Sequence, residues 1–385
     1  MNERERAFHL LRRIEQEGAY AAPLLHNDSG FVRTLVLGVL RWRLRLDDAI
    51  EQLSSRRAAK LDPNVLLILR LGIFQLMFAD VAPYAAVSES VDLAHRYARR
   101  AVGLVNAVLR RATQTDLHAL AKTVATRTSH PEWLIRRWTR IFGEERTARI
   151  AEANQELSYP DVFGGSAGVP SAFVPGMFKL HGSSADTEGY ALDEGSGVIA
   201  DLAAATGSDI LDLAAAPGGK TIVMSARGAH VVSNDISLIR LLPLSVRSRK
   251  IVVSDGRKLA FRRQFATVLI EAPCSATGTI RKNPEIKWRL HESDIARFTS
   301  LQRELLASAL DLASDTVVYS TCSLEREEND DVVQHVLASR NDFERVDAGF
   351  FANDEVRKWI DGGVLRLTPE SGTDGFTAFV LQKIN

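Results

Sequence analysis

Five short apolar runs follow one another in the second half of the chain, and they constrain its fold more than any other feature. The runs are residues 210–213, 231–233, 251–253, 267–270 and 316–319, with helical or loop segments between them. Strands that alternate with helices predict a parallel sheet with helices on both faces. In such sheets ligands bind beyond the carboxyl ends of the strands. The residues after each run are therefore the candidate site residues.

The first part of the chain has a different pattern. Apolar residues recur at helical spacing through residue 125, and a further helical stretch covers 130–156. Pro63 and Pro83 are expected at helix starts or in the turns before them. Residues 158–189 are rich in glycine and proline, which is typical of a linker or a small irregular subdomain.

A chain of 385 residues exceeds what one hydrophobic core usually serves. We therefore expect three regions: a helical domain over 1–125, a connecting helix and linker subdomain over 126–205, and an α/β domain over 206–385. With 45% hydrophobic and 25% charged residues, the composition is that of a globular protein.

Composition also excludes several classes of protein. The longest apolar stretch, 65–79, is too short to span a bilayer, and the charged start is unlike a signal peptide, so we expect a cytoplasmic protein without a membrane partner. Two cysteines cannot form a disulfide framework or the usual zinc site, and no metal is expected. Through Arg111 there are 17 Lys/Arg against 12 Asp/Glu, which fits either a nucleic-acid surface or an unevenly charged one.

Three consecutive strand ends carry residues that suit a nucleoside cofactor. After the first run, Gly218 and Gly219 allow a close backbone approach, and the helix from about Lys220 offers free N–H groups. Asp235 follows the second run at a distance from Gly218 suited to ribose hydroxyls, and Asp255 follows the third, where it would meet the adenine. Each acid alone is more often a turn or N-cap residue. The three features together favour the cofactor.

Both cysteines of the protein follow neighbouring runs of the predicted sheet. Cys274 comes after the fourth run and Cys322 after the fifth. They could be two small buried apolar side chains, but their shared place at the site edge favours a thiolate nucleophile. Thiolate addition at carbon 6 of a cytosine makes carbon 5 able to take a methyl group from a sulfonium donor. Glu271 is the candidate acid near ring nitrogen 3. Loss of the carbon 5 proton then lets the thiol leave.

Four motifs carry a resemblance to a known family. They read LDLAAAPGGKT, APCSATGTIRKNPEIKW, STCSLEREEN and PESGTDGF, and with them the chain resembles the RsmB/Sun family of RNA cytosine-C5 methyltransferases. The resemblance implies an α/β Rossmann-like class I methyltransferase domain that uses S-adenosyl-L-methionine. It implies that Cys322 is the nucleophile and that Cys274 assists product release. The cofactor residues implied are Ala214, Ala215, Ala216, Pro217, Gly218, Gly219, Lys220, Asp235, Asp255 and Glu271.

The front of the chain resembles the helical RNA-binding protein NusB. The segments FVRTLVLGVLRWR, LRLGIFQLMF, APYAAVSESVDLA and GLVNAVLRR occur in the expected order. The implied fold class is multidomain, with an all-α NusB-like domain before the methyltransferase domain. Such a front domain implies small-subunit ribosomal RNA as substrate and partner. We expect the chain to act as a monomer.

Three places depart from the family's pattern. Glu271 stands where the family has aspartate, and residues 159–178 lack the usual RNA-facing motif and are shortened. The stretch between Asp235 and Asp255 is also short and contains Pro243, so we expect the helix there to be broken or absent.

A basic segment follows the first cysteine motif. Arg281, Lys282, Lys287 and Trp288 are expected in a loop, where they would hold phosphates and stack a base. A lone Arg-Lys pair is usually only solvated, but its place beside the cysteine favours RNA contact. The target base must leave its stack to reach the sulfur.

Three other functions compete with this interpretation. The chain could be a non-catalytic RNA-binding or assembly protein on a decayed enzyme body, but retention of both cysteines and of the cofactor-facing acids argues against that. Methylation of an exocyclic amine needs no cysteine and centres on an Asn/Asp-Pro-Pro-aromatic motif, whereas the fourth run here ends in EAPC. A redox dithiol is disfavoured because the cysteines lie 48 positions apart, outside a C-x-x-C arrangement.

Overall fold

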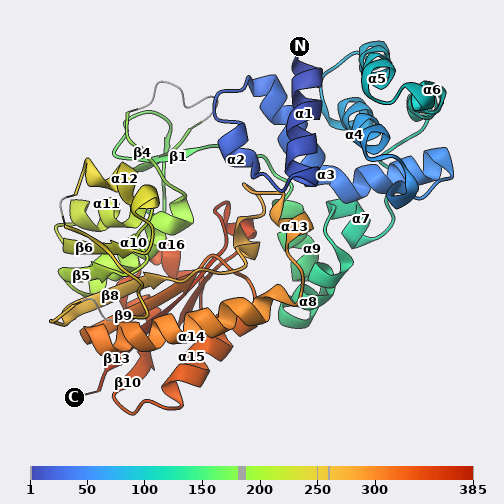
Figure 1. Ribbon diagram of the computed structural model, residues 1–385. Helices are drawn as coiled ribbons and strands as arrows, with labels where there is room; N and C mark the ends of the chain where they lie inside the picture. Colours follow the sequence, from blue (N-terminus) through green and yellow to red (C-terminus); the bar gives the residue numbers. More distant parts are fainter. Residues whose placement is uncertain (1, 181–187, 249, 259–260, 385) are drawn as a thin grey trace. The chain divides into compact units, whose positions relative to one another are not determined.

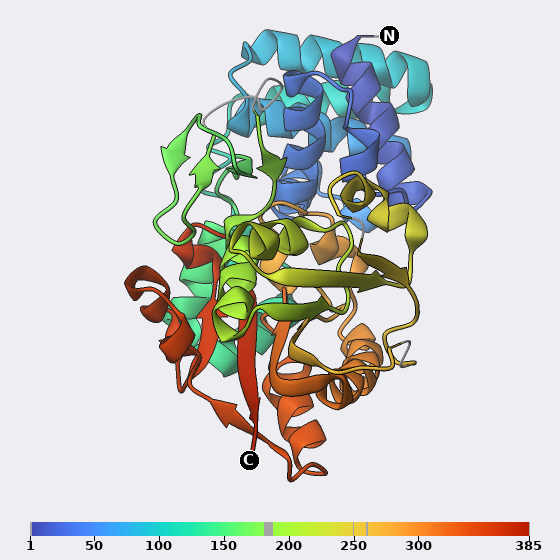
Figure 2. The same cartoon turned by 90° about the vertical axis from the view of Figure 1, so that its left-hand side faces the viewer.

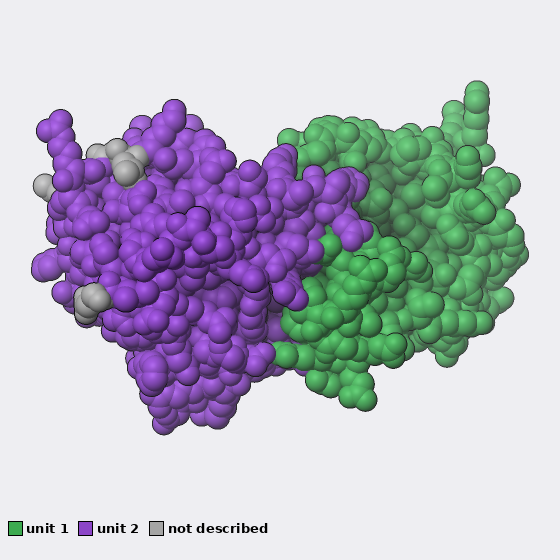
Figure 3. All heavy atoms as spheres, turned by 90° about the horizontal axis from the view of Figure 1, so that it is seen from below, with its two compact units in different colours: residues 1–155, 283–289 green, residues 156–282, 290–385 purple. Residues whose placement is uncertain are grey.

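The computed structural model describes residues 2–180, 188–248, 250–258 and 261–384. Within it the chain forms two compact units, coloured separately in Figure 3. A helical unit comprises residues 1–155 and 283–289, and a sheet unit comprises residues 156–282 and 290–385.

This division differs from the three regions expected from the sequence. The connecting helices after residue 125 belong to the helical unit, because α7 packs against α3 and α9. The glycine- and proline-rich stretch belongs to the sheet unit. Residues 283–289, far along the sequence, return to the helical unit.

The helical unit is entirely helical in its regular elements, which Figure 1 shows in blue to green for residues 1–155 and in orange for α13. Its α-helices are α1 (Glu3–Gln16), α2 (Ala21–Leu24), α3 (Gly30–Ser54), α4 (Pro63–Phe78), α5 (Pro83–Tyr97), α6 (Val102–Ala112), α7 (Val124–Thr128), α8 (Glu132–Phe142), α9 (Glu144–Ala153) and α13 (Ile286–Arg289).

Helix starts follow local capping chemistry. Pro63 and Pro83 are the first residues of α4 and α5, which confirms the predicted starts. The Asp62 side chain accepts the Asn64 backbone N–H at 2.9 Å, and Ser29 caps α3 through the Val32 N–H at 3.2 Å. Helices α1, α3, α4, α5 and α6 then bury their apolar faces in one core.

The sheet unit holds the remaining strands and helices. They are β1 (Asp161–Phe163), β2 (Val169–Pro170), β3 (Met177–Lys179), β4 (Tyr190–Ala191), α10 (Glu194–Thr206), β5 (Asp209–Asp212), α11 (Gly219–Ala226), β6 (His230–Asp235), α12 (Leu238–Ser245), β7 (Ile251–Val253), β8 (Phe265–Glu271), α14 (Asp294–Leu312), β9 (Ala313–Thr321), α15 (Asp330–Leu337), β10 (Phe343–Val346), α16 (Asp354–Arg357), β11 (Ile360–Asp361), β12 (Val364–Leu367) and β13 (Phe376–Lys383).

All five predicted apolar runs form strands of one sheet. The order is β11-β12-β13-β9-β8-β5-β6-β7, with β10 paired to β13. The five strands from β9 to β7 are parallel, as predicted. The edge that follows is antiparallel, because β13 runs against β9 and β12 against β13.

Helices cover both faces of this sheet (Figure 1). Ile210 and Val318 point into a core shared with α10 and α11, whereas Leu211 and Val317 point into a core shared with α14 and α15. Successive strand residues face opposite sides, so continuous apolar runs bury both faces. The carboxyl ends of the parallel strands then lie along one edge.

The predicted irregular stretch contains a second, small sheet, in green in Figure 2. Its order is β2-β3-β1-β4, with antiparallel pairs. Residues 181–187 of this stretch lie outside the described residues.

The expectation of a broken or absent helix before Asp255 is wrong. Helix α12 forms over eight residues and contains Pro243. It begins where the Ser237 side chain caps the Arg240 N–H at 3.4 Å, so proline falls in the second turn of a short, capped helix. Its Leu241 and Leu244 are buried against Ala215, which anchors the helix beside the loop after β5.

Candidate active site

Two cysteine loops meet at the carboxyl edge of the sheet. Strands β8 and β9 are parallel neighbours, and Cys274 and Cys322 follow their ends. The two sulfur atoms lie 3.3 Å apart, and both cysteines are free and partly exposed. The structure therefore brings the two predicted cysteines together at the predicted edge.

A third motif locks the two loops. The Gly278 N–H donates to the Cys322 carbonyl at 2.9 Å, and the Gly375 N–H donates to the Gly278 carbonyl at 2.8 Å. A Cβ at Gly278 would overlap the Gly375 carbonyl, so only glycine fits there. Gly375 of the PESGTDGF motif is thus hydrogen-bonded to the loop that follows Cys274, and that loop is hydrogen-bonded to Cys322.

The two thiols differ in their environments. The pKa of Cys274 is raised well above its usual value, first by its hydrogen bond to Cys322 and then by burial. The two sulfur atoms lie within hydrogen-bond distance of each other, and either thiol can be the donor.

Glu271, the last residue of β8, forms an ion pair with Lys220 of α11. The Lys220 ammonium also donates to the Ser196 hydroxyl at 2.5 Å and lies 5.6 Å from the centre of the Phe376 ring. Lys220, predicted to bind the cofactor, and Glu271, predicted both to bind the cofactor and to act as an acid, are therefore in direct contact. The sequence did not indicate Ser196, which comes from α10 and has no motif around it.

The predicted glycine turn follows β5 and begins α11. Gly218 has φ of +109°, and a Cβ there would lie 2.7 Å from the Cβ of Leu244. Both the backbone conformation and the packing of α12 therefore require glycine. The turn displays residues 214–217 at the sheet edge.

Asp235 ends β6 and is almost fully buried. Its two carboxylate oxygens accept the Ala216 N–H at 3.1 Å and the Ser237 N–H at 2.9 Å. The side chain thus joins its own turn to the loop after β5. Ile236 beside it is 67% exposed, which leaves an apolar surface next to the acid.

Asp255 has a different setting. Arg257 pairs with its carboxylate at 2.7 Å, and the Arg257 backbone N–H donates to it at 3.0 Å. These hydrogen bonds lower the pKa of Asp255 to about 2. The adenine contact predicted for Asp255 stays a prediction.

Sequence reasoning missed one acid of the site. Asp212, the last residue of β5, is 1% exposed and accepts the Thr221 hydroxyl at 2.7 Å. Burial raises its pKa to about 6, against the opposing effect of that hydrogen bond. The available signal was an acidic residue inside the apolar run, where a charge is costly.

The prediction that all four basic-segment residues lie in a loop is wrong for Lys287 and Trp288, which belong to α13. Arg281 is buried and donates to the Gly372 carbonyl at 2.8 Å, and Lys282 pairs with Asp161 and Asp193, which raise its pKa. These contacts lie inside the sheet unit.

Lys287 and Trp288 belong to the helical unit, and their side chains bind backbone carbonyls within it. The Lys287 ammonium donates to the carbonyls of Arg41 and Ser129 at 2.8 and 2.7 Å, and burial lowers its pKa well below the usual value. The Trp288 indole donates to the Leu40 carbonyl at 2.6 Å. RNA contact by Arg281, Lys282 and these two residues stays a prediction, and it requires them to exchange internal partners.

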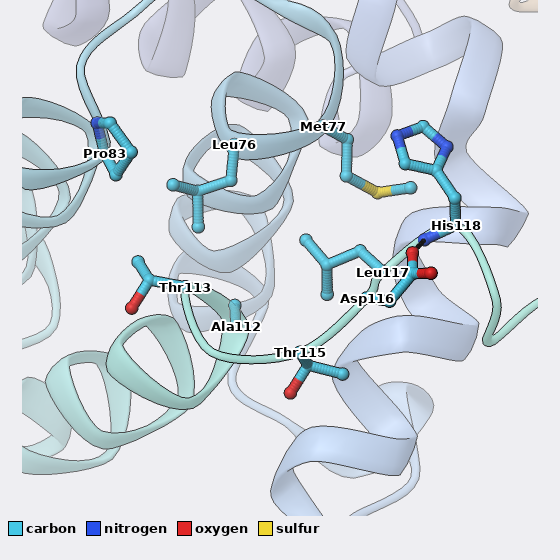
Figure 4. Close-up of a pocket in the computed structure, with 9 residues that line it drawn as sticks. All are labelled: Leu76, Met77, Pro83, Ala112, Thr113, Thr115, Asp116, Leu117 and His118. Carbon is cyan, nitrogen blue, oxygen red and sulfur yellow. Dashed lines mark hydrogen bonds between the residues drawn. The ribbon is translucent and has the colours of Figure 1, made fainter.

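The remaining features contain none of these site residues. A cavity of about 200 Å³ in the helical unit is lined by Leu76, Met77 and His118 among others (Figure 4), and it contains none of the predicted site residues. Among the residues that the structure describes, no three His, Cys, Asp or Glu side chains gather as metal ligands. Within the same ranges, no helix is long and apolar enough to cross a membrane.

Known protein families match both units. The family model described as 16S rRNA methyltransferase RsmB/F matches residues 199–382, and the NusB family model matches residues 1–114. Ribosomal RNA small subunit methyltransferase B of Shigella flexneri is 32% identical over 365 residues, which cover 84% of this chain and 85% of that protein. The protein of the same name from Escherichia coli O127:H6 is 31% identical over the same coverage.

Solved structures match the fold. The crystal structure of PH0851 superposes with a TM-score of 0.76 at 21% identity, covering 100% of this chain and 99% of that one. A methyltransferase homologue from Pyrococcus horikoshii superposes with a TM-score of 0.54 at 22% identity, over 68% of this chain and 98% of that one. With the family matches, these likenesses confirm the predicted fold class of a NusB-like domain followed by a class I methyltransferase domain.

Proposed function

Because the chain belongs to the RsmB/F family of 16S rRNA methyltransferases, we propose that it methylates carbon 5 of a cytosine in small-subunit rRNA through a covalent cysteine adduct. The observation that carries this proposal is the 3.3 Å separation of the Cys274 and Cys322 sulfur atoms at the carboxyl ends of β8 and β9. Methylation of an exocyclic amine requires no thiol, so a pair of thiols at this edge favours addition to the pyrimidine ring.

S-adenosylmethionine is the cofactor of this family, and when bound it supplies an electrophilic methyl group. The residues at the strand ends fit it. Asp235 offers a carboxylate for ribose hydroxyls, and the exposed Ile236 beside it offers an apolar surface for the purine. Asp212 is a buried carboxylate whose ionised form a cationic group would stabilise. We assign the loop from Ala214 to Lys220 to the same cofactor.

Cys322 is the proposed nucleophile. Its sulfur lies 3.3 Å from the Cys274 sulfur, and a hydrogen bond donated by the Cys274 thiol would stabilise a thiolate there. The sulfur forms a bond to carbon 6 of the cytosine, and the electron pair of the 5,6 double bond becomes available at carbon 5. After the methyl group has been added, a water molecule takes the carbon 5 proton, the electrons of that C–H bond restore the 5,6 double bond, and the C6–S bond breaks with its electron pair on the Cys322 sulfur.

Glu271 and Cys274 handle protons in this proposal. Glu271 in its protonated form, with the proton taken from water, donates a hydrogen bond to ring nitrogen 3 while negative charge develops there, and its contact with Lys220 holds it at the end of β8. Cys274 keeps its proton because its pKa is raised, and it can pass that proton to the departing Cys322 sulfur. Without Cys274, the adduct should persist.

The test separates the two cysteines on small-subunit rRNA. Cys322→Ala should give neither methylated RNA nor a protein–RNA band on a denaturing gel. Cys274→Ala should instead accumulate that band, because attack remains possible while release is slowed. If only Cys322→Ala accumulated the protein–RNA band, the roles of the two cysteines would be reversed. If neither variant gave a band, both cysteines would have a structural role only.

Wild-type protein is the control for the whole proposal. If it gives neither 5-methylcytosine nor adduct on naked rRNA or on small subunits, catalysis must be abandoned for a non-catalytic assembly role. Bisulfite sequencing of rRNA from cells that lack the protein would identify the target cytosine.

A further inference from the structure

Each cysteine is followed by a serine, and both serines reach the same buried carboxylate. Ser275 follows Cys274 and Ser323 follows Cys322. The Ser323 hydroxyl donates to Glu328 Oε2 at 2.5 Å, and the Ser275 hydroxyl donates to the same oxygen. The Ser275 backbone N–H donates to Oε1 at 2.8 Å. One side chain therefore connects the two loops that carry the sulfur atoms.

The surroundings of Glu328 consist of neutral donors. Its fourth hydrogen bond comes from the Gln302 side chain of α14, at 3.0 Å from Oε1. None of these four donors carries a positive charge, and the Glu328 side chain is 0% exposed. Burying a carboxylate is costly even when it is hydrogen-bonded, and a neutral side chain of the same shape would avoid that cost. The cost of burying the Glu328 carboxylate therefore indicates that its negative charge has a function.

Three titratable groups face Cys274 at this edge, and one of them is Glu328. The others are Cys322, after β9, and Tyr319, within β9. The pKa of Cys274 is raised first by the hydrogen bond to Cys322, then by burial and by the charges of Cys322 and Glu328. Tyr319 donates to the Glu328 backbone carbonyl at 2.7 Å, which holds the turn that carries the carboxylate.

We propose that Glu328 is a positioning residue for the reaction. Through Ser275 and Ser323 its carboxylate sets the separation of the two sulfur atoms, and through its negative charge it assigns the proton of the pair to Cys274. Glu328 is too deeply buried to touch the RNA, so it acts only through its neighbours. The inference rests on the proposed covalent mechanism and adds the group that gives the two thiols different roles.

The neighbouring Asn329 makes the charge of Glu328 testable by itself. Its amide donates to the carbonyls of Ser323 and Glu325 at 2.9 Å each, and its oxygen accepts the Thr321 hydroxyl at 2.7 Å. These bonds hold the second cysteine loop independently of the carboxylate. Glu328→Gln, which keeps the shape and removes the charge, should therefore fold.

The first measurement follows alkylation of each cysteine in the full-length protein by iodoacetamide as a function of pH, with peptide mapping to separate the two sites. In Glu328→Gln the midpoint for Cys274 should move down by about one pH unit, as expected for loss of a nearby negative charge. Glu344→Gln is the matched control, because Glu344 is an exposed glutamate on β10. An unchanged Cys274 midpoint in Glu328→Gln would overturn the proposal.

A second pair of variants tests the geometry. Ser275→Ala with Ser323→Ala removes the hydroxyl links but keeps the charge, so the Cys274 midpoint should stay within the control range. Phenylarsine oxide, which binds two adjacent thiols, should bind this double variant about tenfold more weakly, a loss of about 1.4 kcal/mol. Equal binding to wild type and double variant would show that the serines do not set the sulfur separation.

Turnover on rRNA connects these readings to function. In Glu328→Gln it should fall about tenfold at neutral pH, with its pH profile shifted in the same direction as the Cys274 midpoint. If turnover of Glu328→Gln fell while its pH profile stayed unshifted, Glu328 would only support the fold, and the proposal would be contradicted. If the wild type forms no adduct, the proposed function fails, while the alkylation profile still decides the role of Glu328.

Discussion

The pKa values of Asp212, at the end of β5, and Asp255, just after β7, are shifted in opposite directions, and the environments of the two acids explain why. Asp212 lies in the apolar interior, where burial raises its pKa to about 6. Asp255 lies near solvent with Arg257, whose hydrogen bonds lower its pKa to about 2. Both are aspartates at the carboxyl ends of parallel strands, so the difference comes from what surrounds each carboxylate.

Asp212 should therefore cost stability at neutral pH. Its raised pKa means that its contribution is fully present below about pH 4 and is lost as pH rises through about 6. Asp212→Asn does not titrate, so its stability relative to wild type should improve by about 2 kcal/mol between pH 4 and pH 7. Urea unfolding at both pH values measures this difference.

Asp255→Asn is the matched comparison for that experiment. The lowered pKa of Asp255 stabilises the fold above its unfolded pKa, and this contribution is lost as pH falls toward about 2. Its asparagine variant should therefore lose stability relative to wild type on going from acid to neutral pH. The same sign for both variants would contradict the assigned environments.

Asp235 should matter for the cofactor more than for the fold. Asp235→Ala removes the proposed acceptor for two ribose hydroxyls and should weaken S-adenosylhomocysteine binding at least tenfold in calorimetry. It also releases the Ala216 and Ser237 N–H groups, so the thermal midpoint must be measured alongside. Undiminished affinity would remove Asp235 from the cofactor site.

Glu271 tests whether one extra methylene matters. Its contact with Lys220 holds the side chain at the end of β8. Glu271→Asp should keep measurable methylation if the carboxyl group still reaches the base. Glu271→Ala should lose adduct and turnover together, as scored on the same denaturing gel. Full activity of Glu271→Ala would exclude it from the chemistry.

At the scale of elements, α13 shows how a short segment can leave its sequence neighbours. Residues 283–289 follow the first cysteine motif but belong to the helical unit. Their buried hydrogen bonds go to backbone carbonyls near the middle of α3 and just after α7. A lysine and a tryptophan that would suit RNA on a surface serve here to anchor a segment.

Lys287→Ala should consequently destabilise the helical unit. It removes a buried aliphatic stem and leaves the Arg41 and Ser129 carbonyls without this donor, with an expected cost of about 2–4 kcal/mol. Thermal unfolding measures it, and Lys122→Ala, at an exposed position of the same unit, is the control. Equal midpoints for both variants would mean that the anchor contributes nothing.

At the scale of the whole molecule, the two units are not independent pieces of sequence. A chain that begins at residue 129 lacks the Leu40 and Arg41 carbonyls that Trp288 and Lys287 bond. Its thermal midpoint should fall, and residues 1–128 supplied as a separate chain should restore it. A shortened chain as stable as the full one would contradict this interdependence.

RNA affinity should depend on salt if phosphates dominate recognition. Binding of the full-length chain to rRNA should weaken linearly on a log–log plot as salt increases, because counterions are released on binding. Fluorescence anisotropy gives the slope. A slope near zero would argue against phosphate contacts as the main source of affinity.

The sequence by itself determined the architecture and the positions of the chemistry. Apolar runs that bury both faces of a sheet predicted five strands, and parallel strands necessarily present their carboxyl ends on one edge. Cys274, Cys322 and the glycine turn at Gly218 follow from that rule, since each lies directly after a run. The antiparallel edge and helix α12 did not follow, because β-pairing partners and a capped short helix leave weak local patterns.

Only the tertiary structure decided what each side chain contacts. It joined Glu271 to Lys220, buried Asp212, turned Lys287 into the helical unit and placed Glu328 between the two cysteine loops. These contacts connect residues that are far apart in sequence, and sequence spacing carries no information about such distances. Burial and partner charge set pKa values and proton locations, so those properties emerge only when the chain is folded.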